Sequence, residues 1–387
     1  MIKAFSGARL FDGERMIDGH ALLVENDLIV GITPLTDQTL GSERHDLDGG
    51  ILAPGLIDWQ VNGGGGVLFN DTPTVAGVRA IVEAHRSDGT TSLLPTVVTG
   101  PTGKLQLALA AAAEAHDCVP GALGIHVEGP FIDVRRKGAH PPAFIRTMTK
   151  DDADRLIAAR KGVMVVTLAP SSVTTDLITR LVQAGIIVSI GHSDATAEEA
   201  QTAFRAGATA VTHLYNAMSQ LVHRQPGVVG AALADPNIIC GFIADGHHVH
   251  EAAARAAFNA KGVDGVALIS DAMPPAAGGP KVFTLEGRRA NQVGTKLTLD
   301  DGTLAGAAIT LMDAVRYMTG TLGIGLADVL KMATLTPARL LRLDDRIGRL
   351  RPGFRADLVH IGYDLNVKSV WIAGEKSAAS TSDCGRK

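Results

Sequence analysis

The middle of the chain alternates short apolar runs with alanine-rich stretches, and this alternation constrains the fold more than any other feature. Eight runs can be counted, nearly continuous in apolar residues, as parallel strands covered on both faces require. Eight strand–helix repeats in roughly 250 residues predict a closed (β/α)8 barrel, and an open, doubly wound sheet is the alternative. The strands are expected at Ile51–Trp59, Thr91–Val98, Ala122–Glu128, Val163–Leu168, Ile186–Gly191, Ala210–His213, Ile238–Ala244 and Val266–Ser270.

Both ends of the chain have a different pattern, with short alternating runs separated by turn residues. Such runs are typical of small antiparallel strands. We therefore expect residues 1–50 and 343–387 to form one small β-sandwich domain, and residues 51–342 to form the barrel. Two further runs, Val282–Leu285 and Lys296–Leu299, predict a β-hairpin inserted near residues 280–300, before the last barrel helix.

The composition excludes several classes of protein. Hydrophobic residues make up 46% and charged residues 20% of the 387 residues, which is enough for a large core. A net charge of −4 without a basic stretch argues against nucleic-acid binding. The three cysteines form no CxxC pair, and the sequence contains neither a signal-peptide pattern nor a run long enough to span a membrane. We expect a cytoplasmic enzyme.

Polar residues with metal-binding chemistry follow several of the predicted strands, at the end where barrel enzymes place their active sites. Carboxylate and imidazole are ligands that zinc and ferrous iron accept, and three protein ligands leave room for a water molecule. A further carboxylate could take a proton from that water. Spacing alone decides neither between His126 and Glu128 nor between His247 and His248. The candidates are His126, Glu128, His192, His213, His247, His248 and Asp271.

Segments along nearly the whole chain resemble the N-acetylglucosamine-6-phosphate deacetylases, a family of the amidohydrolase superfamily. Several of these motifs are specific to that family, and their conjunction is stronger than any one of them. They are PGLIDWQVNG (Pro54–Gly63), GIHVEGPF (Gly124–Phe131), KGAH (Lys137–His140), GHSDAT (Gly191–Thr196), THLYNAM (Thr212–Met218), ADGHHV (Ala244–Val249), ISDAM (Ile269–Met273) and LAGA (Leu304–Ala307).

The resemblance implies roles for individual residues. Metal ligands carry over to Glu128, His192 and His213, and the general base and acid carries over to Asp271. Arg224 matches an arginine that reaches the sugar phosphate in a neighbouring subunit, which implies a homodimer. Substrate contacts carry over to Ala139, His140, Asn216, Ala217, His248, Leu304, Ala305 and Gly306.

The motif after the first strand departs from the pattern of many amidohydrolases. Those enzymes carry His-x-His there to hold a second metal, whereas this chain has Gln60 and Asn62. Neutral amides are poor ligands for zinc or iron, so we expect one divalent ion per subunit, zinc in the first place and ferrous iron as the alternative.

The expected reaction is hydrolysis of N-acetylglucosamine 6-phosphate to glucosamine 6-phosphate and acetate. One alternative is a related amide substrate, such as N-acetylgalactosamine 6-phosphate or a cyclic imide. A second alternative, from a different class, is a non-catalytic scaffold that keeps the barrel.

Overall fold

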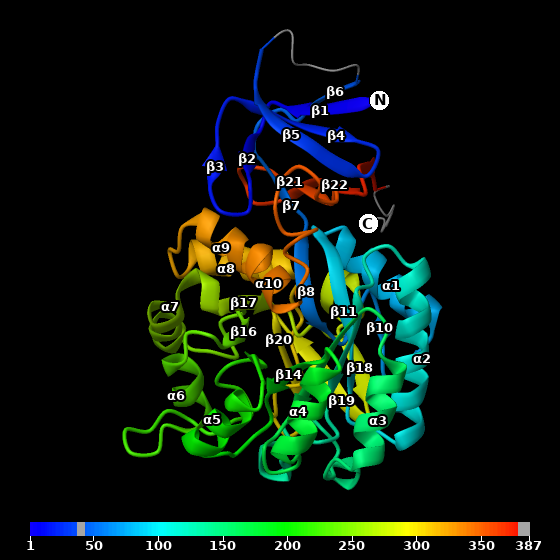
Figure 1. Ribbon diagram of the computed structural model, residues 1–387, viewed down its shortest axis with the longest axis vertical. Coiled ribbons are helices and arrows are strands. Elements are labelled where there is room, and N and C mark those ends of the chain that lie inside the picture. Colours follow the sequence, from blue (N-terminus) through cyan, green and yellow to red (C-terminus); the bar gives the residue numbers. More distant parts are fainter. Residues whose placement is uncertain (37–42, 378–387) are drawn as a thin grey trace.

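The computed structural model describes residues 1–36 and 43–377, and its largest unit is a ring of eight parallel strands (Figure 1). Each strand pairs with the next along the chain. The ring closes between its first and last strands, where the Asp271 N–H donates to the Gln60 carbonyl over 3.0 Å and Val61 bridges to Ala272. The predicted (β/α)8 barrel is confirmed. The strands are β8 (Leu56–Val61), β11 (Thr90–Val98), β12 (Gly124–Glu128), β13 (Val163–Leu168), β14 (Ile187–Ile190), β15 (Ala210–Val211), β16 (Ile239–Ile243) and β17 (Val266–Ile269).

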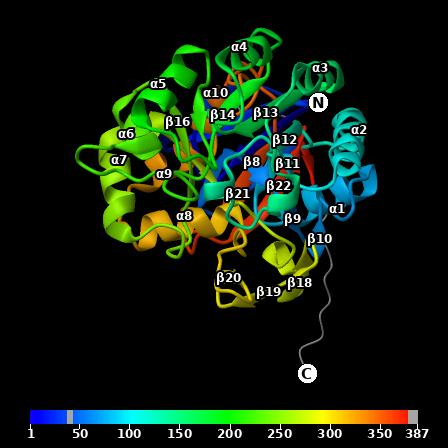
Figure 2. The same ribbon diagram turned by 90° about the horizontal axis from the view of Figure 1, so that it is seen from below.

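Helices surround this ring on its outer side, as the view along the barrel shows (Figure 2). The short helix α10 contains Pro337 in its first turn, where the missing N–H costs no helical hydrogen bond. Within the described ranges, no helix is both long and apolar enough to cross a membrane. The helices are α1 (Val75–Arg86), α2 (Thr102–Cys118), α3 (Lys150–Ala159), α4 (Thr175–Gln183), α5 (Ala197–Arg205), α6 (Gly227–Ala234), α7 (Glu251–Gly265), α8 (Leu311–Gly320), α9 (Leu326–Ala333) and α10 (Leu335–Leu340).

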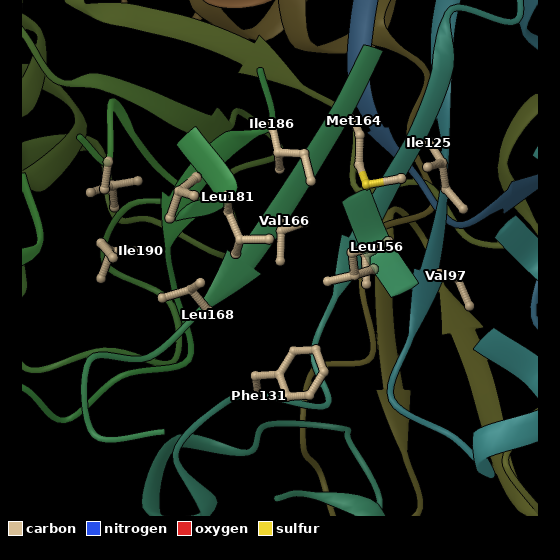
Figure 3. Packing of buried hydrophobic residues seen from close by; sticks show 14 of the residues in the cluster. Val97, Ile125, Phe131, Leu156, Met164, Val166, Leu168, Leu181, Ile186 and Ile190 are labelled. Carbon is tan, nitrogen blue, oxygen red and sulfur yellow. The ribbon is translucent and has the colours of Figure 1, made fainter. Parts of the chain in front are cut away.

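Alternate residues of the barrel strands pack in two separate layers, because successive strand side chains point to opposite faces. On β13, Met164, Val166 and Leu168 belong to the apolar layer between strands and helices, beside Leu156 of α3 and Leu181 of α4 (Figure 3). The residue between two of them, Val165, belongs instead to the cluster that includes Trp59 of β8. Burial on both faces explains why the strands are continuous in apolar residues.

The two ends of the chain build two small sheets beyond the N-terminal ends of the barrel strands (Figure 1). Phe5 and Leu22 of the first sheet pack with Leu52, Leu358 and Trp371 of the second in one buried cluster. The first sheet has the order β5 (Leu28–Pro34), β4 (His20–Glu25), β1 (Ile2–Ser6), β6 (Glu43–Asp46). The second has the order β23 (Glu375–Lys376), β22 (Val367–Ile372), β21 (Leu358–Ile361), β7 (Ile51–Pro54), β2 (Arg9–Phe11), β3 (Met16–Ile17).

The prediction of a single strand at Ile51–Trp59 is wrong, because this segment forms two strands. β7 pairs with β2 and β21 in the six-stranded sheet, and only β8 enters the barrel. The break falls at Gly55, whose backbone runs so close to Thr91 that a Cβ atom would lie 2.0 Å from the Thr91 hydroxyl. Residues 51–54 therefore belong with the small sheets, beyond the boundary predicted after residue 50.

The insertion before the last barrel helix is a three-stranded antiparallel sheet, not the predicted hairpin. It consists of β18 (Val282–Leu285), β19 (Arg288–Val293) and β20 (Lys296–Leu299), and it lies beside the barrel mouth (Figure 2). The middle strand was missed because its sequence, RRANQV, lacks apolar alternation. Leu285 and Leu297 anchor the sheet on Leu68 and Met273.

Candidate active-site cavity and metal centre

A cavity of about 370 Å³ opens at the C-terminal ends of the barrel strands. Most of the predicted site residues line it, although they come from distant parts of the chain. Ala305 is fully buried, and neither it nor Gln60 and Arg224 is among the lining residues. The predicted residues that do line it are Asn62, Glu128, Ala139, His140, His192, His213, Asn216, Ala217, His248, Asp271, Leu304 and Gly306.

Three potential ligand atoms converge at the floor of this cavity. The Nε2 atoms of His192 and His213 lie 3.1 and 3.0 Å from Glu128 Oε1, and 3.0 Å from each other. In each ring Nδ1 faces a backbone carbonyl, that of Arg136 for His192 and that of Asn216 for His213. A carbonyl only accepts, so Nδ1 carries the proton and the Nε2 lone pair is directed at the common point.

This donor set fits a divalent cation. Two Nε2 atoms that both lack a proton cannot hydrogen-bond to each other or to a carboxylate oxygen, whereas both can bind one ion together with that oxygen. His140 forms a second set of three with Glu128 and His192, whose ligand atoms all lie within 4.8 Å of one another.

The chain turns sharply after three of the barrel strands. His192, His213 and Asp271 have φ values of 46°, 34° and 49°, in the left-handed region that favours glycine. Such strained positions persist only where the surroundings hold them, and they concentrate at functional sites.

Two amide side chains hold Asp271 beside the ligand set. Gln60 Nε2 donates to both Glu128 Oε2 and Asp271 Oδ1 at 3.2 Å, and Asn62 Nδ2 donates to Asp271 Oδ1 at 2.7 Å. Burial, and then the charge of Glu128, raises the pKa of Asp271 to about 6. The Gln60 amide thus joins the two carboxylates, and the Asn62 amide holds Asp271, at the positions where many amidohydrolases carry His-x-His.

A further buried carboxylate, Asp58, lies at the seam between β8 and β17. It accepts hydrogen bonds from the backbone N–H groups of Gln60 and Ser270, the latter directly before Asp271. Burial raises its pKa to about 7. Asp58 therefore fixes the backbone on both sides of the seam from which Gln60 and Asp271 project.

The structure resolves the two choices that spacing left open. His126 is fully buried, hydrogen-bonded through Nε2 to Thr167 over 2.7 Å, and outside the cavity, whereas Glu128 lines it. His247 contacts Thr295 in an exposed position, whereas His248 lines the cavity. His248 Nδ1 is held by Asp245 Oδ2 at 2.7 Å.

Sequence reasoning missed four polar residues of the cavity wall: Arg135, Arg136, Glu286 and Thr303. None of them follows a barrel strand, so strand-end reasoning had no means of finding them. The basic run directly before the KGAH motif was the available signal for the two arginines. Arg224 does not line this cavity; it is exposed in the loop between β15 and α6, where it lines a second pocket with Arg136 and Asp194.

Comparison with known proteins assigns the class of this fold and site. The model described as "Amidohydrolase family" matches residues 51–376, and the one described as "NagA composite domain" matches residues 4–52. The chain belongs to the amidohydrolase family.

Its relatives have more specific names. The chain is 42% identical to an N-acetylgalactosamine-6-phosphate deacetylase of Shewanella sp. (strain ANA-3), covering 95% of this chain and 94% of the relative. It is 36% identical to an N-acetylglucosamine-6-phosphate deacetylase of Haemophilus influenzae, with coverages of 87% and 89%. A solved N-acetylglucosamine-6-phosphate deacetylase from Pasteurella multocida superposes with a TM-score of 0.95 at 35% identity, covering 98% and 100%.

Proposed function

We propose that this protein hydrolyses N-acetylglucosamine 6-phosphate to glucosamine 6-phosphate and acetate. The observation that carries the proposal is the position of Asp271, which one amide, that of Gln60, joins to the proposed metal ligand Glu128. A candidate base thus lies beside a candidate cation site in a cavity of suitable size for a small ligand.

We assign the cation to Glu128, His192 and His213, because their ligand atoms all lie within 3.1 Å of one another. Zinc is the first choice and ferrous iron the alternative, since both accept this ligand set. A divalent ion held there supplies Lewis acidity to a water molecule and to the acetamide carbonyl.

In this proposal Asp271 accepts a proton from the attacking water and later delivers it to the leaving amine, because an amide nitrogen leaves poorly as an anion. Asn62 and Gln60 hold its carboxylate in place through the bonds described above. Burial lowers the pKa of His140 to about 3, so its imidazole is neutral. His140 Nδ1 lies 2.7 Å from the Thr99 hydroxyl, and we assign the hydroxyl as the donor, which leaves the imidazole proton on Nε2 to be donated to the substrate.

We further propose that the active form is a homodimer in which Arg224 of one subunit binds the phosphate in the other. Arg224 does not line the cavity of its own protomer, and its guanidinium suits bidentate phosphate binding. Its loop also exposes two apolar side chains, Leu221 (55%) and Val222 (50%), which a partner subunit would cover.

N-acetylgalactosamine 6-phosphate is the second candidate substrate, and one observation favours it. The relative from Shewanella, 42% identical, carries that name, whereas the relative from Haemophilus influenzae is 36% identical. The cytoplasm is the proposed compartment, supported by two described cysteines, Cys118 and Cys240, that are both free. Cys384 lies outside the described residues.

The decisive experiment is acetate release by protein stripped of metal and reloaded with zinc or ferrous iron, combined with elemental analysis. We expect about one ion per subunit and turnover of at least one of the two N-acetylhexosamine 6-phosphates, with unphosphorylated N-acetylglucosamine much poorer. If the metal-loaded protein releases acetate from neither sugar phosphate, the deacetylase proposal fails. That result would favour the alternative of a non-catalytic scaffold that keeps the barrel.

A further inference from the structure

The inserted sheet brings one carboxylate, Glu286, to the cavity in an unfavourable backbone conformation. Glu286 and Gly287 form the two-residue turn between β18 and β19, with φ values of 47° and 78°. This is the pattern of a type I′ turn, whose first position favours asparagine, aspartate or glycine. A glutamate with φ of 47° is strained, and contacts of its side chain must compensate for this strain.

That side chain is clamped at one of its two oxygens. Glu286 Oε1 accepts a hydrogen bond from Asn70 Nδ2 at 3.1 Å and an ion-paired one from Lys104 Nζ at 2.8 Å. Asn70 is itself fixed, since it bonds both the N–H and the carbonyl of Val98 at the end of β11. The carboxylate is therefore ion-paired and held against the barrel, and its side chain is only 10% exposed.

The second oxygen, Oε2, receives no hydrogen bond from the residues that the structure describes in 1–36 and 43–377. Glu286 lines the same cavity as Glu128 and Asp271, and these three are the only described carboxylates that do so. An ionised carboxylate accepts hydrogen bonds and donates none. Glu286 thus presents a fixed, charged acceptor to whatever the cavity binds.

Charge decides which part of a sugar phosphate can lie there. A phosphate is repelled by a carboxylate, and in the proposed function the acetamide group lies beside Asp271 and the proposed metal ligands. The remaining donors of an N-acetylhexosamine 6-phosphate are the hydroxyls of its sugar ring.

We propose that Glu286 is a specificity-determining residue, whose Oε2 accepts a hydrogen bond from one hydroxyl of the substrate's sugar ring. This inference rests on the proposed function and deepens it. A site built to hydrogen-bond a hydroxyl discriminates strongly against an analogue that lacks it, because its own buried polar group is then left unpaired.

The test compares the wild type with Glu286→Ala, both metal-loaded, on the preferred sugar phosphate and on its 1-deoxy, 3-deoxy and 4-deoxy analogues. We expect Glu286→Ala to lower kcat/KM on the parent substrate by about 10- to 100-fold, mainly through KM. With the wild type, one deoxy analogue should show a kcat/KM lower than that of the parent substrate by a similar factor. With Glu286→Ala, the kcat/KM of that analogue should be almost the same as that of the parent substrate. If each analogue lowers kcat/KM, relative to the parent substrate, by the same factor in the wild type and in Glu286→Ala, then Glu286 contacts no ring hydroxyl and the inference is overturned.

Lys104→Met separates substrate contact from a purely structural role. It removes the same ion pair but leaves the carboxylate in the cavity, so it should still discriminate against the critical deoxy analogue. If Lys104→Met loses that discrimination as completely as Glu286→Ala does, the ion pair acts only by positioning the inserted sheet. That result would count against a contact between Glu286 and the substrate. If the wild type deacetylates no sugar phosphate, both the proposed function and the role of Glu286 are overturned. If the wild type is active but the Glu286→Ala substitution does not change the discrimination against any deoxy analogue, only the role of Glu286 is overturned.

Discussion

Two carboxylates on either side of one barrel seam differ in what they contribute. Asp58 and Asp271 are both buried and both have a raised pKa, about 7 and about 6. Asp271 lines the cavity and accepts hydrogen bonds from amide side chains of the site, whereas Asp58 lies outside the cavity lining and accepts hydrogen bonds from the N–H groups of Gln60 and Ser270. Substitutions at the two positions should therefore affect different measurements.

Asp271→Asn should leave the metal content intact, because residue 271 is not among the proposed ligands. Turnover should fall by about 10²- to 10⁴-fold, the typical contribution of a positioned acid–base group. Steady-state kinetics and elemental analysis on the same sample check both halves. Wild-type turnover in the variant would remove Asp271 from the proposed mechanism.

Asp58→Asn should change how stability depends on pH. The folded state holds the Asp58 proton up to pH about 7, whereas the unfolded chain releases it near the ordinary pKa of 3.8. The free energy of unfolding of the wild type therefore falls relative to the variant as the pH rises from about 4 to about 7, by on the order of 4 kcal/mol, since each pKa unit corresponds to about 1.4 kcal/mol. Urea unfolding at several pH values measures the difference, and a difference independent of pH would contradict the assignment.

At the level of elements, several helices begin with a reciprocal cap that the local sequence encodes. Thr310 starts α8, its hydroxyl accepts from the Asp313 N–H, and the Asp313 carboxylate accepts from the Thr310 N–H. The same capping box starts α3 at Thr149 and α5 at Thr196. These caps satisfy N–H groups that a helix end would leave without partners.

Thr310→Ala should lower the free energy of unfolding by about 1 kcal/mol, the usual cost of losing a cap. Thr310→Ser is the matched control, because it keeps the hydroxyl and should retain most of the stability. Chemical denaturation of both variants is the measurement. Equal losses in the two variants would assign the effect to packing of the threonine methyl group instead of the cap.

For the whole molecule, the proposed homodimer places residues of two subunits in one site. A subunit with Arg224→Ala lacks the arginine it would give to its partner, whereas one with Asp271→Asn lacks its own base. In a mixed dimer, the first subunit keeps Asp271 and receives Arg224 from the second, which makes one complete site.

Co-expression of the two inactive variants should thus restore activity to about a quarter of the wild-type value per subunit, since random pairing yields half mixed dimers with one complete site each. Acetate release is compared with that of each variant alone, and sedimentation confirms the dimer. Activity that merely equals the sum of the separate variants would place Arg224 outside the neighbouring site.

The sequence by itself predicted the eight strand–helix repeats and the chemical character of the strand ends, and it left an open sheet as the alternative to the barrel. Strands buried on both faces need continuous apolar runs, and the polar residues after them reach one rim because all strands are parallel. That reasoning named seven candidate residues before any coordinates, and the family resemblance selected Glu128, His192, His213 and Asp271 from them. Their catalytic roles remain proposals.

Only the tertiary structure decided which neighbouring residues face the cavity and which strands leave the barrel. His126 lies outside the cavity with its Nε2 bonded to Thr167, and His247 lies outside it with its Nε2 bonded to Thr295. Both threonines are far from these histidines in the chain. β7 joins the small sheets because β2 and β21 offer it hydrogen bonds, and Glu286 reaches the cavity only because Asn70 and Lys104 hold it there. Such contacts depend on chain segments that meet only on folding, so no local pattern encodes them.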